Sequence, residues 1–130
     1  MTGDGPGFDV PLLDKVDLRM DPDCLGFAAA RPAGRLRMQG WLRLADSQDV
    51  DPLVLLLAVD ALPPAVWDHT PGGWSPTVQL TVHIRALAAP GWLVVRTRTS
   101  SVHDGWHDEV AEVWDSRGHL VAQSQQLARV

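Results

Sequence analysis

DPLVLLLAVDALPP occupies residues 51–64. Asp51 is a typical N-cap residue, and Pro52 suits the first helical position because an N–H there would have no partner inside the helix. Pro63 and Pro64 end the segment, since a residue that precedes proline is driven out of the α region. Between the prolines only Asp60 is polar. The pattern predicts a helix of about 11 residues that is apolar, and therefore buried, on every side.

Strand-like segments lie on both sides of this helix. Before it, polar and apolar residues alternate from Arg35 to Leu44, which predicts a half-buried strand. The other candidate strands are residues 12–20, 77–85, 92–101, 106–114 and 119–130. This order predicts an α+β fold, with a five- to six-stranded antiparallel sheet, the last four strands in a meander and the helix on the concave face.

Length and composition restrict the class of protein. A chain of 130 residues suits a single domain, for which we expect a flexible N-terminus at residues 1–10 and one domain at residues 11–130. No secretory signal pattern is evident, and the longest apolar run, Leu53 to Val59, is far below the ~20 residues of a membrane span. The net charge of −5 argues against a nucleic-acid partner. We therefore expect a cytoplasmic protein with neither a membrane nor a nucleic-acid partner.

Asp60 is the most informative residue of the helix. A carboxylate among apolar neighbours is costly to bury, and its place near the helix C-terminus should raise its pKa further. A carboxylate with a raised pKa in a dry position is a candidate general base. The structural alternative is an aspartate that reaches solvent or caps a loop amide.

Gln126 and Thr77 are weaker candidates. Gln126 shares one face of the last strand with the small residues Ala122, Ser124 and Ala128, so it should point toward the helix. If that strand lies at an edge, Gln126 is instead solvated. Thr77 opens its strand directly after Pro76, a position where threonine is also common for structural reasons.

A metal site is not expected. His103, Asp104, His107 and Asp108 are close in sequence, but a hairpin would scatter them over two faces and a tip, whereas metal ligands must converge. The chain also lacks the Gly-x-Ser-x-Gly pattern of a serine nucleophile, and its single cysteine, Cys24, excludes an internal disulfide. We expect no cofactor.

From about Arg35 onward the chain resembles the C-terminal half of type II acyl-CoA thioesterases, the thioesterase-like proteins with a double hot-dog fold. The resemblance rests on four segments in order: LLAVD at 56–60, WSPTVQL at 74–80, EVWDSRG at 112–118 and LVAQSQQ at 120–126. It implies a single hot-dog domain, in which one long buried helix is wrapped by an antiparallel sheet.

The resemblance also implies a reaction. In that family an Asp near the end of the helix, a Thr that opens the next strand and a Gln in the last strand orient a water that attacks a thioester carbonyl. The matching residues are Asp60, Thr77 and Gln126. The substrate implied is an acyl-CoA or acyl-carrier thioester.

The phosphates of coenzyme A suggest a role for three further residues. Arg85, Arg96 and Arg98 are weak candidates to contact them, because arginines on strand surfaces are usually only solvated.

The family carries two hot-dog repeats and this chain has room for one, so we expect a homodimer or a second hot-dog half. Two alternatives remain open. One is a non-catalytic hot-dog module that binds an acyl group or mediates dimerisation. The other is a hydratase or dehydratase, ranked last because those enzymes use a histidine and none lies on or beside the helix.

Overall fold

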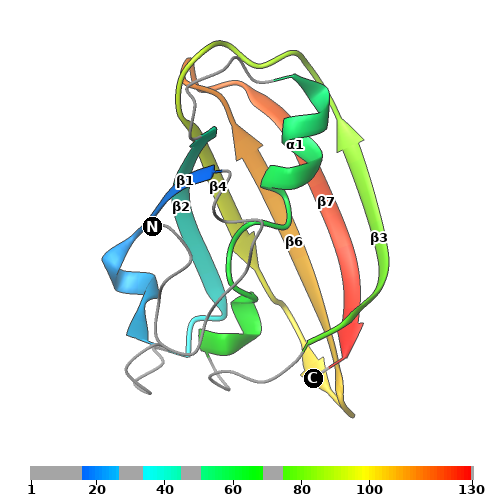
Figure 1. The fold of residues 1–130 in the computed structure, drawn as a ribbon. Helices are drawn as coiled ribbons and strands as arrows, with labels where there is room; N and C mark the ends of the chain where they lie inside the picture. The colour runs from blue at the N-terminus through cyan, green and yellow to red at the C-terminus, as the bar shows by residue number, and fades with distance from the viewer. Residues whose placement is uncertain (1–15, 27–33, 45–50, 69–74, 130) are drawn as a thin grey trace.

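The structure is a computed structural model that describes residues 16–26, 34–44, 51–68 and 75–129. Within these residues a curved, seven-stranded antiparallel sheet carries one α-helix on one face (Figure 1). The helix is α1, Pro52–Ala58, and two short 3-10 helices are η2, Pro22–Cys24, and η4, Ala65–Asp68. The strands are β1 Val16–Met20, β2 Arg37–Leu44, β3 Thr77–Ile84, β4 Leu93–Arg98, β5 Val102–His103, β6 Trp106–Trp114 and β7 Leu120–Arg129. The α+β class is confirmed, and the described strands exceed the predicted number by the two-residue β5.

The strands lie in the order β1-β2-β4-β6-β7-β3, and β5 pairs with β6. The predicted meander of four strands is therefore wrong for β3, which pairs with β7 at one edge of the sheet instead of preceding β4 as its neighbour. Alternation along a strand fixes which side chains share a face, but it does not fix which strand lies alongside. This crossover brings the start of β3 beside the end of β7 (Figure 1).

Helix α1 begins as predicted and ends earlier. The Asp51 side chain accepts a hydrogen bond from Val54 N–H at 3.0 Å, so the N-cap is confirmed. The helix stops at Ala58, after 7 residues. The Val59 amide still bonds to a carbonyl four residues back, whereas the amides of Asp60 and Ala61 bond to carbonyls only three residues back. Pro63 and Pro64 have no N–H to continue the α pattern, so the chain tightens into a turn.

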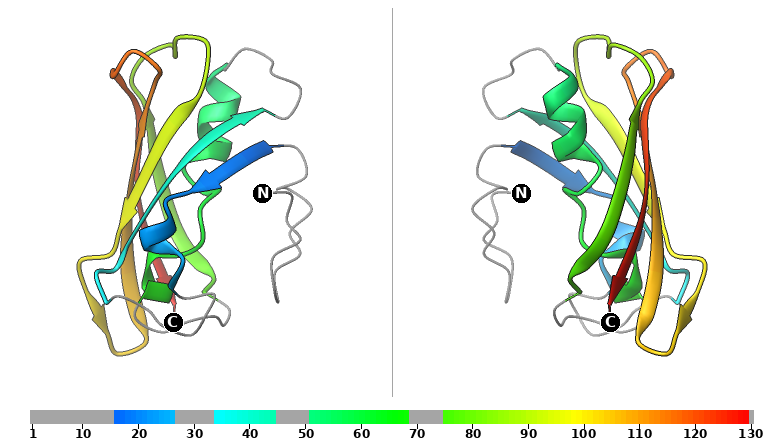
Figure 2. Two further views of the ribbon diagram at one scale, coloured as in Figure 1. Left: turned by 90° about the vertical axis from the view of Figure 1, so that its left-hand side faces the viewer. Right: turned by 90° about the vertical axis from the view of Figure 1, so that its right-hand side faces the viewer.

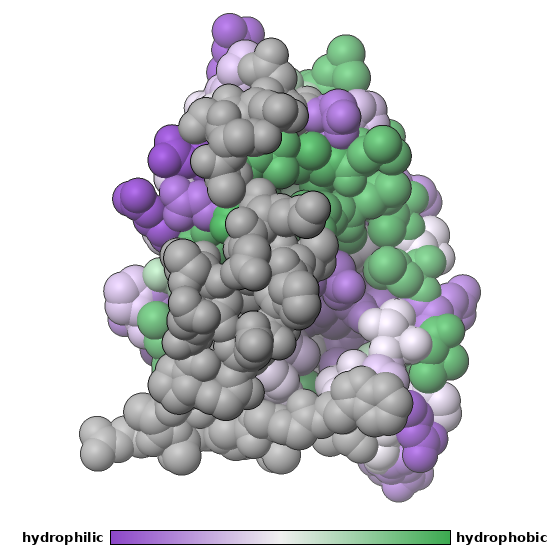
Figure 3. Space-filling view, viewed as in Figure 1, coloured by the Kyte–Doolittle hydropathy of each residue, from purple (hydrophilic) through white to green (hydrophobic). Residues whose placement is uncertain are grey.

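One side of α1 is covered by the sheet and the other is not. Leu55 and Ala58 are buried, but Leu53 is 72% and Leu56 is 45% exposed. The prediction of a helix buried on every side is therefore wrong for this chain. Leu80 and Ile84 of β3 are also exposed, and Figure 3 shows apolar side chains gathered over α1 and β3. We call Leu53, Leu56, Leu80 and Ile84 the α1–β3 surface.

The core lies between α1 and the inner face of the sheet, as the side views show (Figure 2). Its buried members include Leu55 and Val59 near α1 and Leu42, Val95 and Val113 on the central strands. None of the helices in the described part of the chain is long and apolar enough to span a bilayer.

Candidate active site

Thr77 and Gln126 meet at the edge of the sheet formed by β3. Thr77 is the first residue of β3, and its Oγ1 donates a hydrogen bond to Gln126 Oε1 at 2.6 Å. Gln126 is 6% exposed and shares the buried face of β7 with Ser124 and Ala128, so its predicted inward orientation is confirmed. The structure thus brings two of the three predicted site residues into direct contact.

Glu109 continues this contact into the interior. It stands opposite Gln126 in the β6–β7 register and is 7% exposed. Its Oε2 accepts a hydrogen bond from Gln126 Nε2 at 2.7 Å, and its Oε1 accepts one from Ala65 N–H at 2.8 Å. A chain of hydrogen bonds therefore runs from Thr77 through Gln126 to Glu109, with the Ala65 amide at its inner end.

The Glu109 carboxyl has an altered acidity. Burial raises the pKa of Glu109 to about 7, because a charged carboxylate loses hydration in the interior. The hydrogen bond from Ala65 works against this rise, while the negative charges of Asp60 and Asp108 add to it. Glu109 is thus a buried acid that titrates near neutral pH.

Asp60 lies in the turn that follows α1. It is exposed to solvent in the single chain, so the prediction that it is kept from bulk water is wrong for this structure. The surrounding protein still removes part of its hydration and raises the pKa of Asp60, the direction that its sequence context predicts. Its negative charge adds to the rise in the pKa of Glu109.

His107 lies on the same face of β6 as Glu109 and is 3% exposed. Its Nε2 is 2.6 Å from Ser75 Oγ, and its Nδ1 is 3.3 Å from the Asp108 carbonyl oxygen. The sequence pattern placed His107 among possible metal ligands, but its contact with Ser75 joins residues 32 positions apart and could not be read from local sequence. Both ring nitrogens have protein partners, so the ring holds the chain just before Thr77 and is not directed at a substrate.

These groups together suit the activation of water. Asp60 is a carboxylate at the surface with a raised pKa. Thr77 on β3 and Gln126 on β7, two paired strands, offer further hydrogen-bonding atoms. The whole chain, residues 1–130, matches the family model described as acyl-CoA thioesterase C-terminal domain. The chain belongs to this family. The resemblance seen in the sequence is therefore confirmed.

Solved structures support the same family and the hot-dog fold. A proposed thioesterase II from Thermobifida fusca is 44% identical, with a TM-score of 0.82 over 95% of this chain and 48% of that chain. A hot-dog protein of unknown function from Alicyclobacillus acidocaldarius is 23% identical, with a TM-score of 0.77 over 92% of this chain and 46% of that chain, and shows the fold alone.

A curated relative adds a shorter match. An uncharacterised protein of Mycobacterium tuberculosis H37Rv is 41% identical over 80 residues, which are 62% of this chain and 28% of the relative. The chain thus spans about half the length of the solved relatives, and its match covers less than a third of the mycobacterial one.

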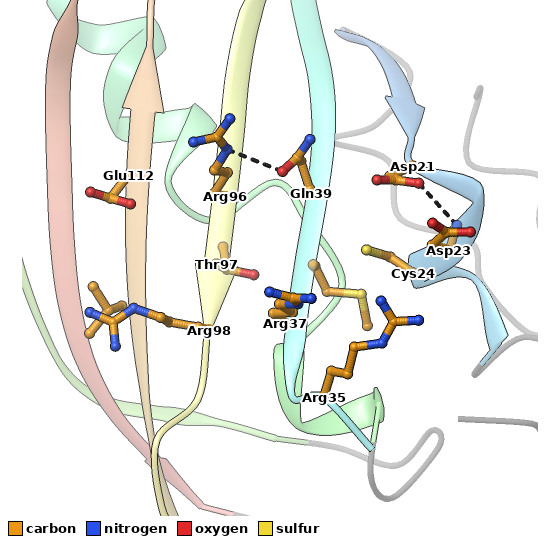
Figure 4. Close-up of a pocket in the computed structure, with 12 residues that line it drawn as sticks. Asp21, Asp23, Cys24, Arg35, Arg37, Gln39, Arg96, Thr97, Arg98 and Glu112 are labelled. Carbon is orange, nitrogen blue, oxygen red and sulfur yellow. Dashed lines mark hydrogen bonds between the residues drawn. The ribbon is translucent and has the colours of Figure 1, made fainter. Parts of the chain in front are cut away.

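The three arginines proposed to contact phosphates lie away from Thr77 and Gln126. Arg96 and Arg98 are exposed and alternate with the buried Thr97 on β4, and they line a cavity of about 450 Å³ together with Arg35, Arg37 and Glu112 (Figure 4). Arg85 follows the far end of β3 and donates a hydrogen bond to Gln123 Oε1 at 2.9 Å. The structure therefore does not bring these arginines into the site.

The side chains of the hairpin that were considered as metal ligands point in different directions. His103 and Asp104 are highly exposed at the β5–β6 turn, whereas His107 points inward to Ser75. In the described part of the chain no group of three or more potential metal ligands is found.

Glu109 is the site residue that the sequence analysis missed. The signal was present, because Glu109 shares one face of its strand with Ala111 and Val113, where an acidic residue is out of place.

Proposed function

We propose that this domain hydrolyses acyl-CoA or acyl-carrier thioesters, with Asp60 as the general base and Thr77 and Gln126 as the groups that orient the water. The proposal rests chiefly on the hydrogen bond between Thr77 and Gln126. Asp60 has a raised pKa, and its charge acts on Glu109, the partner of Gln126. Membership of the thioesterase family supports it. The alternative is a hot-dog module that binds an acyl group or mediates dimerisation without catalysis. A measurement of thiol release distinguishes the two functions.

The reaction uses one water molecule. Its oxygen forms a bond to the thioester carbonyl carbon while one of its protons passes to the Asp60 carboxylate. The carbon–sulfur bond then breaks, and the departing thiolate takes up the proton held by Asp60, which gives a thiol and a carboxylic acid and restores the Asp60 carboxylate. The Thr77 hydroxyl, oriented by the Gln126 amide, holds the water in place before the reaction, which lowers the entropic part of the barrier.

The α1–β3 surface supports a proposal about the assembly. It is apolar, exposed and adjacent to the open edge of β3, a combination that soluble proteins normally cover. Because the solved relatives are about twice as long as this chain, we propose that a second hot-dog domain covers it. For the isolated chain that domain is a second copy, and the acyl group lies between the two.

The decisive experiment measures thiol release from acyl-CoA esters of increasing chain length. The domain should release thiol from at least one ester, and Asp60→Asn should lower kcat by about 100-fold or more, because the amide cannot accept the proton. Asp104→Asn is the matched control, since Asp104 lies at an exposed turn.

Two results would contradict the proposal. If the folded domain releases no thiol from any ester, it is a binding module. If Asp60→Asn is as active as the parent domain, another group is the base.

A further inference from the structure

The hydrogen bonds from Thr77 through Gln126 to Glu109 run in one direction. An ionised carboxylate accepts hydrogen bonds and cannot donate them. Glu109 receives one from the Ala65 amide and one from Gln126, and in the described part of the chain it forms no ion pair. Above its pKa of about 7 Glu109 is ionised, and the side of Gln126 that faces it must then be the NH2 group.

This orientation of the Gln126 amide determines the direction of its hydrogen bond with Thr77, and of the bond that Thr77 can form with water. With its NH2 group directed at Glu109, Gln126 presents Oε1 to Thr77. Thr77 must then donate its hydroxyl proton to Gln126, which leaves the lone pairs of Oγ1 to accept a hydrogen bond from water. In the proposed reaction, a water held by Thr77 Oγ1 and the Asp60 carboxylate would direct both hydrogens at acceptors and keep its oxygen lone pairs free for attack.

We propose that Glu109 is a positioning residue, which fixes the orientation of the Gln126 amide and thereby makes Thr77 an acceptor toward the attacking water. The proposal deepens the thioesterase function proposed above and rests on it. Without Glu109, Gln126 can rotate its amide by half a turn. Thr77 would then accept from Gln126 and donate to the water, which would occupy one of the two lone pairs of the water and leave one of its O–H groups without this acceptor.

The test is a reciprocal exchange of the two side chains. In Glu109→Gln the NH2 groups of residues 109 and 126 face each other, and neither can accept a hydrogen bond from the other. In Gln126→Glu the carboxylates of residues 109 and 126 face each other, and neither can donate one. The double variant E109Q/Q126E restores one donor opposite one acceptor and again leaves an acceptor toward Thr77. We expect each single variant to lower kcat by about 10- to 100-fold with little change in KM, and the double variant to recover most of that loss.

The assays are made at about pH 8, above the pKa of Glu109, with its titratable neighbours Asp60, Asp108 and His107 left unchanged. Glu112→Gln is the matched control, because Glu112 is on the same strand but points to the opposite face, and it should keep the parental kcat. If folded Glu109→Gln keeps the parental kcat, or if the double variant is no better than the poorer single variant, the inference is wrong.

A second measurement is independent of catalysis. The side-chain NH2 protons of Gln126, observed by NMR, should be protected from exchange with water in the parent domain and lose protection in Glu109→Gln. Absence of protection in the parent would overturn the inference even if thioesters are hydrolysed. Protection without hydrolysis in the parent would show that the hydrogen bond exists and that the proposed function is wrong.

Discussion

The hydroxyl of Thr77 forms a 2.6 Å hydrogen bond to a buried amide, although Thr77 itself is exposed in the single chain. Thr77→Val keeps the shape of the side chain and removes its hydroxyl. We expect kcat for thioester hydrolysis to fall by about 10- to 100-fold, because the water loses one of the groups that hold it. The free energy of unfolding, measured with urea, should fall by about 1 kcal/mol, because Gln126 Oε1 loses its hydrogen-bond partner. Thr77→Ser keeps the hydroxyl and should keep most of the activity; equal activities of the Val and Ser variants would contradict a role for the hydroxyl.

Glu109 should make the stability of the domain depend on pH. Its pKa is about 7 in the folded protein against 4.5 ordinarily, so between these values the folded state binds more protons than the unfolded chain. The free energy of unfolding should therefore fall as pH rises from about 4.5 to about 7, by roughly 3 kcal/mol in all, and level off above that. Urea unfolding at a series of pH values measures this slope. Glu109→Gln does not titrate and should flatten the slope, and an unchanged slope would show that another group causes it.

The residues of the site differ in how far the sequence alone could predict them. The inward orientation of Gln126 followed from the period of two along its strand, and Thr77 was recognised mainly through the family resemblance. Their contact could not be predicted, because it depends on β3 pairing with β7 and on the local bulge after Thr77. Glu109 could have been found from its apolar strand face, but its partners Gln126 and Ala65 come from distant parts of the chain.

At the scale of elements, α1 depends on its N-cap, because the helix is only 7 residues long. Asp51 Oδ1 accepts a hydrogen bond from Val54 N–H at 3.0 Å. Asp51→Ala should lower the free energy of unfolding by about 1 kcal/mol, as measured by urea denaturation. Asp51→Asn can still accept the hydrogen bond and should stay within a few tenths of a kcal/mol of the parent. Equal losses in both variants would point to the charge and not to the cap.

The elements themselves were largely predictable and their arrangement was not. The start of α1, the inner face of β2 and the strand nature of β6 and β7 follow from local patterns of residue type. The early end of the helix follows from Pro63 and Pro64 acting on carbonyls one turn back, an effect that reaches further than the residue before a proline. The position of β3 beside β7 is a long-range choice that no local pattern contains.

At the scale of the whole molecule, the leucines on the uncovered side of α1 led to the prediction of a wholly buried helix, although a single chain leaves them exposed. The sequence of α1 is that of a helix covered on every side, whereas the sheet of one chain covers only the side with Leu55 and Ala58. A second hot-dog domain on the α1–β3 surface would reconcile the two. It would also enclose Asp60, which is exposed in the single chain, and so raise its pKa further.

The assembly can be tested with two leucines on neighbouring strands. Leu80 on β3 is 42% exposed and belongs to the α1–β3 surface, while Leu127 on β7 is 41% exposed and points to the opposite face of the sheet. A dimer of the 14.2 kDa chain has twice that mass, about 28 kDa, by light scattering after size-exclusion chromatography. Leu80→Glu should shift the protein to the mass of a monomer and lower thioester hydrolysis, because a buried charge opposes association and the acyl site loses its second wall. Leu127→Glu should leave both mass and activity as in the parent. A parent chain that is monomeric and fully active would show that one hot-dog domain suffices, and a dimer that survives Leu80→Glu would place the interface elsewhere.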